Sequence, residues 1–319
     1  MPIRFDLPGL GRNIGPLKAH EWQVDVAYRY LYTDQFYVGS EINDSAGPFG
    51  KGPSIKIHSW ELTVNYGVTS RLSLALRFPF SAGSATRLFA DNNLHTTAAA
   101  GLGDISAIGT VWLWNPTKHT KGNLALGFGV KTPSGDNAVI DRFFPASGPP
   151  TRAPVDQSIQ LGDGGWGVIL QTQAYRAISS RTSGYVNASY LLSAKEKTDV
   201  PSPIPGGVLG VPDIYSVRVG VAYALLAERG LSMSLGPRID GIPIRDLIGG
   251  GDNNFRRPGY SLFIDPGVTF NHGRNTFWIN VPIRIHQDFK RSLADIEHNR
   301  VGGGDLAKYL VFTGYSVRF

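Results

Sequence analysis

Charged side chains recur at alternate positions within otherwise apolar stretches of the chain, and arginine is the most frequent of them. Seven such residues are predicted to face a common interior: Arg29, Arg77, Arg218, Arg238, Arg284, Asp240 and Asp265. The arginine guanidinium presents a planar fork of N–H donors that matches a carboxylate. Because arginines outnumber aspartates in this set, a confined interior would carry excess positive charge and attract small anions. If cations were preferred instead, either the carboxylates Asp25, Glu61, Asp240 and Asp265 or the carboxylates of the long loops would control entry.

The same charges allow a second interpretation, in which they form an internal lattice of ion pairs that fills the interior and conducts nothing. Interior size decides between the two, since eight-stranded barrels are filled by side chains and sixteen-stranded ones hold an aqueous channel. Periodicity alone leaves both interpretations open.

Candidate catalytic groups are scattered along the chain. The histidines are His20, His58, His95, His119, His272, His286 and His298. Most fall in predicted turns, loops or the tail, while His286 is predicted to point inward. His58 precedes Ser59, but neighbours on a strand face opposite sides. No nucleophile, base and orienting group converge, and neither zinc-ligand spacing nor a nucleotide-binding glycine motif occurs, so we expect no enzyme, no cofactor and no metal.

A Gly-Asp motif recurs before several predicted strands. It places four carboxylates at one rim: Asp104, Asp163, Asp252 and Asp305. A ring of carboxylates could bind Ca²⁺, which takes several oxygen ligands. Alternatively, each aspartate accepts hydrogen bonds from backbone donors where a loop turns into a strand, and the generic turn chemistry of Gly-Asp favours this interpretation.

Apolar residues at every second position predict the elements that hold these side chains. In the last eleven residues, "YLVFTGYSVRF", Tyr309, Val311, Tyr315, Val317 and Phe319 share one face, which indicates a strand. Twelve strands are predicted, near 22–33, 54–68, 72–80, 104–115, 122–132, 165–177, 184–193, 213–226, 230–241, 258–271, 275–287 and 307–319. The alternation changes phase near Ser59, after Ile55 and Ile57, and predicts a β-bulge there.

The connections alternate in length. Short links such as "GVTSR", "AERG" and "NHGRN" alternate with long segments at about 39–53, 81–103, 133–164, 194–212, 242–257 and 288–306. Short periplasmic turns and long extracellular loops are typical of an outer-membrane barrel. Outward aromatics are predicted at the short-turn end (Trp22, Tyr66, Tyr223, Phe270, Phe277 and Phe319) and at the other rim (Tyr32, Phe80, Tyr215, Tyr260 and Tyr309). A soluble sandwich or lipocalin-like barrel fits strands of this length and two aromatic levels poorly.

Composition agrees with a single membrane barrel. The 319 residues show no linker, so we expect one domain at 22–319 behind a periplasmic or lumenal segment at 1–21. The 39 glycines exceed the roughly 22 of average usage. Cysteine is absent, the formal net charge is +6, and the mean hydropathy of −0.10 comes with no run of apolar residues long enough for a membrane helix.

Three stretches carry a resemblance to a known family. They are "VNYGVTSRLSLALRFPF", "GLGDISAIGTVWLW" at 101–114 and "LALGFGVKTPSGD" at 124–136, and together they cover residues 64–136. This part of the chain resembles the family of outer-membrane proteins named after the meta pathway of phenol degradation. The resemblance implies a barrel found alongside catabolic pathways and taken to admit small aromatic or hydrophobic solutes; it identifies no substrate.

We therefore expect an all-β fold, a transmembrane antiparallel up-and-down barrel of about twelve strands in a bacterial outer membrane. Its partners would be the lipid bilayer, lipopolysaccharide and a small-molecule solute, with no nucleic acid, and the barrel would be a monomer. The expected function is passive diffusion of organic anions or aromatic acids through an arginine-lined lumen. One alternative is a laterally opening uptake channel for hydrophobic compounds, with a pocket lined by Leu88, Phe89, Phe143, Phe144 and Phe255. The other is a closed structural or adhesive barrel.

Overall fold

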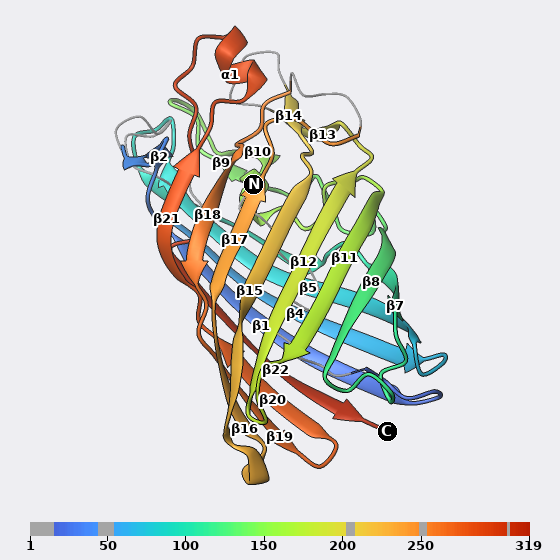
Figure 1. Cartoon of the computed structure of the whole chain (residues 1–319). Helices are drawn as coiled ribbons and strands as arrows, with labels where there is room; N and C mark the ends of the chain where they lie inside the picture. Colours follow the sequence, from blue (N-terminus) through green and yellow to red (C-terminus); the bar gives the residue numbers. More distant parts are fainter. Residues whose placement is uncertain (1–15, 44–53, 202–207, 249–253, 305–306) are drawn as a thin grey trace.

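The chain forms a closed antiparallel β-barrel (Figure 1). The computed structural model describes residues 16–43, 54–201, 208–248, 254–304 and 307–319. Their barrel strands are β1 (Trp22–Thr33), β4 (Ser54–Gly67), β5 (Leu72–Leu88), β7 (Ser106–Trp112), β8 (Gly122–Lys131), β11 (Gly167–Ala177), β12 (Thr182–Ser193), β15 (Ile214–Leu226), β16 (Leu231–Leu235) continued by β17 (Pro237–Ile242), β18 (Gly259–Ile264) continued by β19 (Gly267–His272), β20 (Asn275–Asn280) continued by β21 (Ile283–Phe289), and β22 (Tyr309–Arg318). Pairing of β1 with β22 closes the sheet. With each interrupted strand counted once, the described residues make the predicted twelve-stranded barrel.

Apolar side chains cover the outside of the barrel, as the alternation predicts. On β1, Trp22 and Val26 are each 48% exposed, whereas Gln23 and Asp25 between them are buried. Aromatic rings pair on the outer surface near the short turns, with centroids 4.6 Å apart for Trp22 and Tyr66. An apolar exterior around a polar interior is the inverse of a soluble barrel and is what a bilayer requires.

No helix within the described ranges is both long enough and apolar enough to cross a membrane.

The bulge predicted near Ser59 is wrong. Strand β4 pairs with β1 and β5 without a register shift, and Ile55, Ile57 and Ser59 all face inward and are buried. The apparent change of phase arises because the lumen near the long loops, which we call the upper lumen, is apolar. The inner face of β4 therefore carries isoleucines there. A bulge occurs instead at Ile285, where the register between β18 and β21 shifts. It turns His286 outward and exposed, so the predicted inward position of His286 is also wrong.

The segment at 81–103 is a hairpin and not the predicted loop. Strand β5 continues to Leu88, and its upper part pairs with β6 (Leu94–Leu102). The lower part of β5 pairs with β7, and the chain bends between β6 and β7 at 103–105. Small residues such as Gly83 and Ala85 lack the apolar alternation of a lipid-facing strand, so the pattern contains no signal for this extension.

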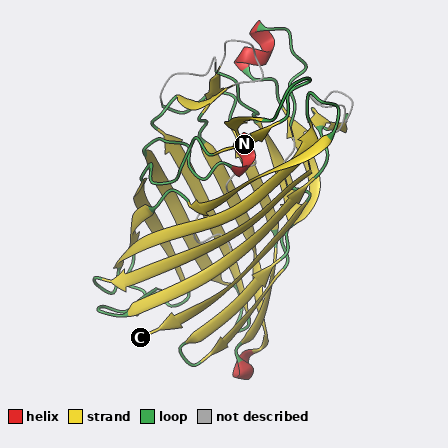
Figure 2. Cartoon of the chain, turned by 180° about the vertical axis from the view of Figure 1, so that it is seen from behind, coloured by secondary structure: helices red, strands yellow, loops and turns green. Residues whose placement is uncertain are grey.

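Short elements decorate the two ends of the barrel. At the long-loop end lie β2 (Tyr37–Val38) with β3 (Glu41–Ile42), β9 (Ile140–Phe143) with β10 (Thr151–Pro154), β13 (Lys197–Pro201) with β14 (Val208–Gly210), and α1 (Leu293–Glu297). A 3₁₀ turn, η3 (Ala227–Arg229), occupies one short connection. A second, η2 (Gln157–Ile159), belongs to the loop at 133–164 and lies inside the barrel mouth (Figure 2).

Three neighbouring strands are interrupted at matching positions, which we call the seam. The interruptions fall at Gly236, at Asp265–Pro266 and at Val281–Pro282. Two backbone hydrogen bonds join the three gaps, one from Asp265 N to Gly236 O (2.8 Å) and one from Val281 N to Pro266 O (3.1 Å). A Cβ on Gly236 would lie 1.9 Å from the carbonyl oxygen of Val219, so no larger residue fits there. The three interruptions therefore lie side by side along one line of the wall.

Candidate functional site

The upper lumen is closed by the loop at 133–164, which we call the plug. Its residues Val155, Ile159 and Leu161 are buried in one apolar cluster with inward residues of the barrel wall. The wall contributes Leu31, Ile55, Ile57, Ala85, Ala99, Phe263, Ala307 and Leu310 to this cluster. Gly83 leaves the room that the plug needs, since a Cβ there would lie 2.7 Å from Ile159 Cγ2.

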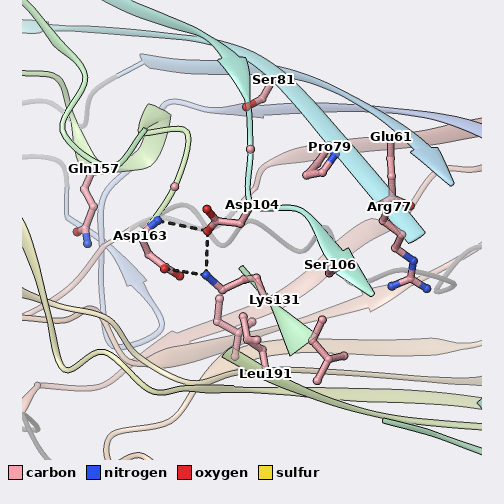
Figure 3. Close-up of a pocket in the computed structure, with 14 residues that line it drawn as sticks. Glu61, Arg77, Pro79, Ser81, Asp104, Ser106, Lys131, Gln157, Asp163 and Leu191 are labelled. Carbon is pink, nitrogen blue, oxygen red and sulfur yellow. Dashed lines mark hydrogen bonds and ion pairs between the residues drawn. The ribbon is translucent and has the colours of Figure 1, made fainter. Parts of the chain in front are cut away.

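Lys131 anchors both ends of the plug to the wall (Figure 3). Its buried Nζ donates to Asp104 Oδ2 at 2.8 Å, to Asp163 Oδ1 at 2.7 Å and to the Gly165 carbonyl at 2.7 Å. Both aspartates also accept backbone donors, from Gly135 and Gly165, as the turn interpretation of the Gly-Asp motif predicts. Asp252 and Asp305 lie outside the described residues. Among the residues that are described, no cluster of three or more acidic or histidine side chains could hold a metal ion.

Four of the seven predicted lining residues meet in a buried ion-pair lattice. Arg218 Nε lies 2.8 Å from Asp265 Oδ2, and Arg238 Nε lies 2.9 Å from Asp240 Oδ2. Ser216 Oγ donates to Asp240 at 2.5 Å. Each of these four charged residues is at most 2% exposed. The arginines and aspartates therefore neutralise one another on this side of the lumen.

Aromatic rings complete the lattice. The Arg218 guanidinium lies over the Tyr185 ring at 4.9 Å from its centroid, and that of Arg238 lies over Phe312 at 4.7 Å. Cation–π contact of this kind stabilises a charge that has been removed from water. The lumen beside β12, β15, β17 and β22 is thus filled by packed and paired side chains.

Arg29 and Arg284 also face inward, but each is held by hydrogen bonds apart from the lattice. Arg29 Nη2 donates to Ser59 Oγ at 3.0 Å, across β1 and β4. Near the long-loop rim, Arg284 donates to Gln287, Gln35 and Tyr37, each at 3.0 Å. The structure therefore does not bring the five arginines together as one ring.

Arg77, the remaining predicted residue, lies where two cavities meet. The upper cavity, of about 90 Å³, is lined by Glu61, Arg77, Pro79, Ser81, Gly103, Asp104, Ser106, Lys131, Gln157, Gly162, Asp163, Ile169, Leu191 and Ile214. The lower cavity, of about 80 Å³, is lined by Pro16, Leu17, Gln23, Asp25, Glu61, Thr63, Asn65, Ser73, Ala75, Arg77, Thr110, Trp112, Gln171 and Gln173. Among these described residues only Glu61 and Arg77 line both cavities, and we call this pair the neck. Figure 3 shows the two side chains next to one another on the wall of the upper cavity.

The sequence analysis names Glu61 only as one of the carboxylates that would act if cations were preferred. Its place in the neck follows from strand pairing. Glu61 on β4 is opposite Pro79 on β5, and Thr63 is opposite Arg77. Glu61 and Arg77 are therefore diagonal neighbours on one face, about 7–8 Å apart at Cα and within reach of long side chains. Thr63 Oγ1 donates to Glu61 Oε1 at 3.0 Å and fixes one carboxylate oxygen.

Below the neck the wall is polar and internally bonded. Asp25, fully buried, accepts hydrogen bonds from Gln23 Nε2 (2.8 Å), from Asn65 Nδ2 (2.6 Å) and from the Ser316 hydroxyl. Arg318 Nε donates to Gln23 Oε1 at 2.9 Å and extends this network to the last strand. Polar groups on this path are thus largely committed to one another, and the neck is where two opposite charges adjoin both cavities.

The residues predicted for a hydrophobic pocket divide between two separate clusters. Phe89 contacts Phe143 and Phe144, with ring centroids 5.7 and 5.5 Å apart, and His95 stacks on Phe144 at 3.5 Å. His95 also bonds to Asp91 at 2.7 Å, and this hydrogen bond lowers the pKa of Asp91 at the exposed hairpin tip. Phe255 packs elsewhere, with Val200, Leu209 and Ala294.

Comparison with known proteins identifies the fold. No family model and no curated protein matches the chain. The structure of an outer-membrane channel from Pseudomonas putida F1 superimposes with a TM-score of 0.64 and 14% identity, over 98% of this chain and 99% of that one. A Pseudomonas aeruginosa FadL homologue and the CymD monoaromatic hydrocarbon channel are weaker matches, both with a TM-score of 0.44 and 8% identity, covering 95% and 98% of this chain and 90% and 95% of theirs. Together with its apolar exterior, the first likeness shows that the chain has the fold of a bacterial outer-membrane β-barrel.

Proposed function

We propose that this barrel is an outer-membrane channel through which small organic anions, aromatic acids among them, diffuse passively. The observation that carries the proposal is the pair of cavities that meet at the neck in a lumen narrowed by the plug and the lattice. The barrel would act as a monomer embedded among lipids and lipopolysaccharide, and without catalysis. Its apolar outer surface, continuous around a closed sheet, supports a position among lipids.

Arg77 is the proposed contact for the carboxylate of a solute. Its guanidinium borders both cavities, and its fork of donors suits a carboxylate. The other predicted lining residues, Arg29, Arg218, Arg238, Arg284, Asp240 and Asp265, line neither of these two cavities and would support the wall of the lumen. The anion preference therefore depends mainly on one arginine.

Cavity size requires movement during passage. A benzene-sized ligand needs a cavity of about 150 Å³, so the upper cavity, of about 90 Å³, is too small for an aromatic ring without movement of its walls. An aromatic acid would displace the plug, whose Gln157, Gly162 and Asp163 border the upper cavity. Flux of aromatic acids should accordingly be slower than flux of short carboxylates.

Uptake into proteoliposomes tests the proposal. We expect acetate and benzoate to enter vesicles that contain the barrel, and Arg77→Ser to reduce entry of both relative to an uncharged alcohol of similar size. Arg29→Ser is the matched control, because it removes an inward arginine that borders neither cavity. A barrel that is folded but passes neither solute, with no conductance in planar bilayers, would contradict the proposal and favour a closed structural barrel.

A second candidate, lateral uptake of hydrophobic compounds, is favoured by one observation. The wall bends at 103–105, where β6 leaves the barrel, and Gly103 and Asp104 at this bend line the upper cavity. Ile169 on β11, Leu191 on β12 and Ile214 on β15 line the same cavity and would offer an apolar surface to such a solute. Uptake of toluene but not of benzoate, unchanged in Arg77→Ser, would support this candidate over the first.

A further inference from the structure

Lys56 is a cation on the lipid-facing side of the barrel. It lies on the outward face of β4, between Tyr32 of β1 and Ser84 of β5, and its side chain is exposed. Among the outward positions of the described barrel strands, it is the only lysine or arginine in the half toward the long loops. Its side chain makes no ion pair or hydrogen bond with the described residues, whereas Lys308 at the same rim is paired with Asp34 at 3.1 Å. A charge on an otherwise apolar surface needs an anion from outside the chain.

The height of Lys56 fits the outer boundary of the bilayer. On β4, Tyr66 belongs to the aromatic pair near the short turns, and Lys56 lies ten residues away toward the long loops. At about 3.4 Å per residue and a tilt of about 35–45°, this separation spans about 24–28 Å along the membrane normal. The apolar band of an outer-membrane barrel is about 25 Å tall. Lys56 therefore lies at the level of the lipid headgroups on the long-loop side.

His58 provides a second donor beside Lys56. The two residues are consecutive on the outward face of β4, about 7 Å apart at Cα, which is within the reach of a lysine side chain. His58 Nδ1 is bonded to the Tyr28 hydroxyl at 2.7 Å. The imidazole also packs against the rings of Tyr30 and Trp60, with centroids 5.1 and 6.2 Å away. A neutral histidine that accepts a hydrogen bond at Nδ1 carries its hydrogen on Nε2, which can then donate to an anion.

Small residues leave both donors open on one side. Ala82 of β5 is opposite His58, and Ser84 is opposite Lys56. Beyond Ser84, the hairpin continues with Ala98 of β6, which is exposed. A headgroup can therefore approach the ammonium and the imidazole from the side of β5 and β6 without meeting a large side chain.

We propose that this surface of β1, β4 and β5 binds a phosphate group of lipopolysaccharide. Lys56 Nζ supplies the charge and His58 Nε2 a directed hydrogen bond, and both are donors that phosphate oxygens accept. Below them Trp60 and Phe80 are 44% and 50% exposed and face the acyl chains. Lipopolysaccharide occupies the outer leaflet of a bacterial outer membrane, on the side where Lys56 lies. The proposal rests on the position in the outer membrane stated under the proposed function and is independent of solute passage.

Titration of lipid A into the folded barrel in detergent, followed by native mass spectrometry, tests this site. We expect diphosphorylated lipid A to bind the wild type and Lys56→Gln to weaken the binding about fivefold or more, because it removes the cation. Lys56→Arg should bind as the wild type does. His58→Phe, which keeps a ring but loses the donor, should weaken binding by a smaller factor. Lys118→Gln is the matched control, since it removes an exposed lysine from the short connection between β7 and β8 at the other end of the barrel.

Equal binding of lipid A to the wild type and to Lys56→Gln would overturn the site, as would equal binding of lipid A and its dephosphorylated form. Displacement of lipid A by an equal concentration of phosphatidylglycerol would contradict the assignment to lipopolysaccharide. Heat-modifiability on gels reports whether each variant is folded. If His58→Phe does not fold, the Lys56 variants decide the proposal, because that side chain has no bond within the described chain to lose. Conductance and benzoate uptake of Lys56→Gln should equal those of the wild type, so a barrel that binds lipid A but passes no solute would contradict the channel function alone.

Discussion

The inward arginines have different roles because their surroundings in the lumen differ. Arg218 and Arg238 are completely surrounded and each is paired with an aspartate, so they have a structural role. Arg77 has the same side chain and similar burial, but it borders two cavities. Residue type and strand phase alone do not distinguish these roles; the position of each side chain relative to the cavities does.

The Arg218–Asp265 pair gives a stability prediction at this scale. Arg218→Met should cost about 3–5 kcal/mol, because it leaves a fully buried carboxylate without its counter-charge. The double variant Arg218→Met/Asp265→Leu should recover most of that loss, since it removes both charges. Urea titration of the barrel in lipid vesicles measures both. Equal destabilisation of the single and double variants would show that the packing of these side chains matters more than their charges.

Among the elements, the plug controls access to the cavities. Gly83→Val places atoms where Ile159 now lies, so the plug should be pushed from its seat and the conductance should rise several-fold. Gly109→Val is the control, because a Cβ at Gly109 meets Leu74 Cδ2 at 3.5 Å and the Phe128 carbonyl oxygen at 3.9 Å, which are ordinary contacts. If the two variants conduct alike, the plug at this contact does not limit passage.

The strands could be predicted from the sequence and the plug contacts could not, because lipid restricts the outer side chains and the lumen does not restrict the inner ones. Lipid imposes apolar side chains on the outside of every strand, so alternation is regular and the twelve strands can be read from it. The lumen imposes no such rule, since it holds ion pairs at mid-height and an apolar cluster above. The inward isoleucines of β4 therefore gave the same sequence pattern as a β-bulge, and the small residues of the β5–β6 hairpin showed no alternation of apolar and polar positions.

The candidate site was predictable in part. Strand phase could be read for the seven charged residues, because phase depends only on alternation. It could not show that Asp240 and Asp265 neutralise Arg238 and Arg218, nor that Glu61 and Arg77 both border the two cavities, because these relations depend on register between strands.

For the whole molecule, the apolar exterior is the main determinant of insertion. Leu74→Arg should impair refolding into vesicles at a cost of about 2–4 kcal/mol near the midplane, because Leu74 is 51% exposed on the outer surface. Val24→Arg and Val281→Arg should behave similarly. Substitution of inward Ser73 or Ser234 by asparagine should be mild. If the inward substitutions were the more damaging ones, the lipid-facing and lumen-facing sides of every strand would be exchanged.

The N-terminal segment gives a second prediction for the whole barrel. Pro16 and Leu17 line the lower cavity, and the Lys18 carbonyl lies so close to Gly67 that a Cβ there would be 2.0 Å from it. Deleting residues 2–18 should therefore raise conductance by opening the periplasmic mouth. Unchanged conductance would favour a tail that lies outside the lumen. Melting curves of the truncated barrel serve as a control for its folding.

The seam gives the barrel a line of mechanical weakness. Two backbone bonds, from Asp265 to Gly236 and from Val281 to Pro266, join the three gaps. Pro266 and Pro282 have no amide hydrogen, so bending along this line leaves few N–H donors exposed to lipid without a partner. A barrel that can bend in this way can follow a change in bilayer thickness with one wall while the opposite wall, with its continuous β4 and β5 ladder, stays rigid. Deuterium exchange in vesicles of short-chain and long-chain lipids should therefore differ most at Gly236, Asp265 and Val281, and least along β4.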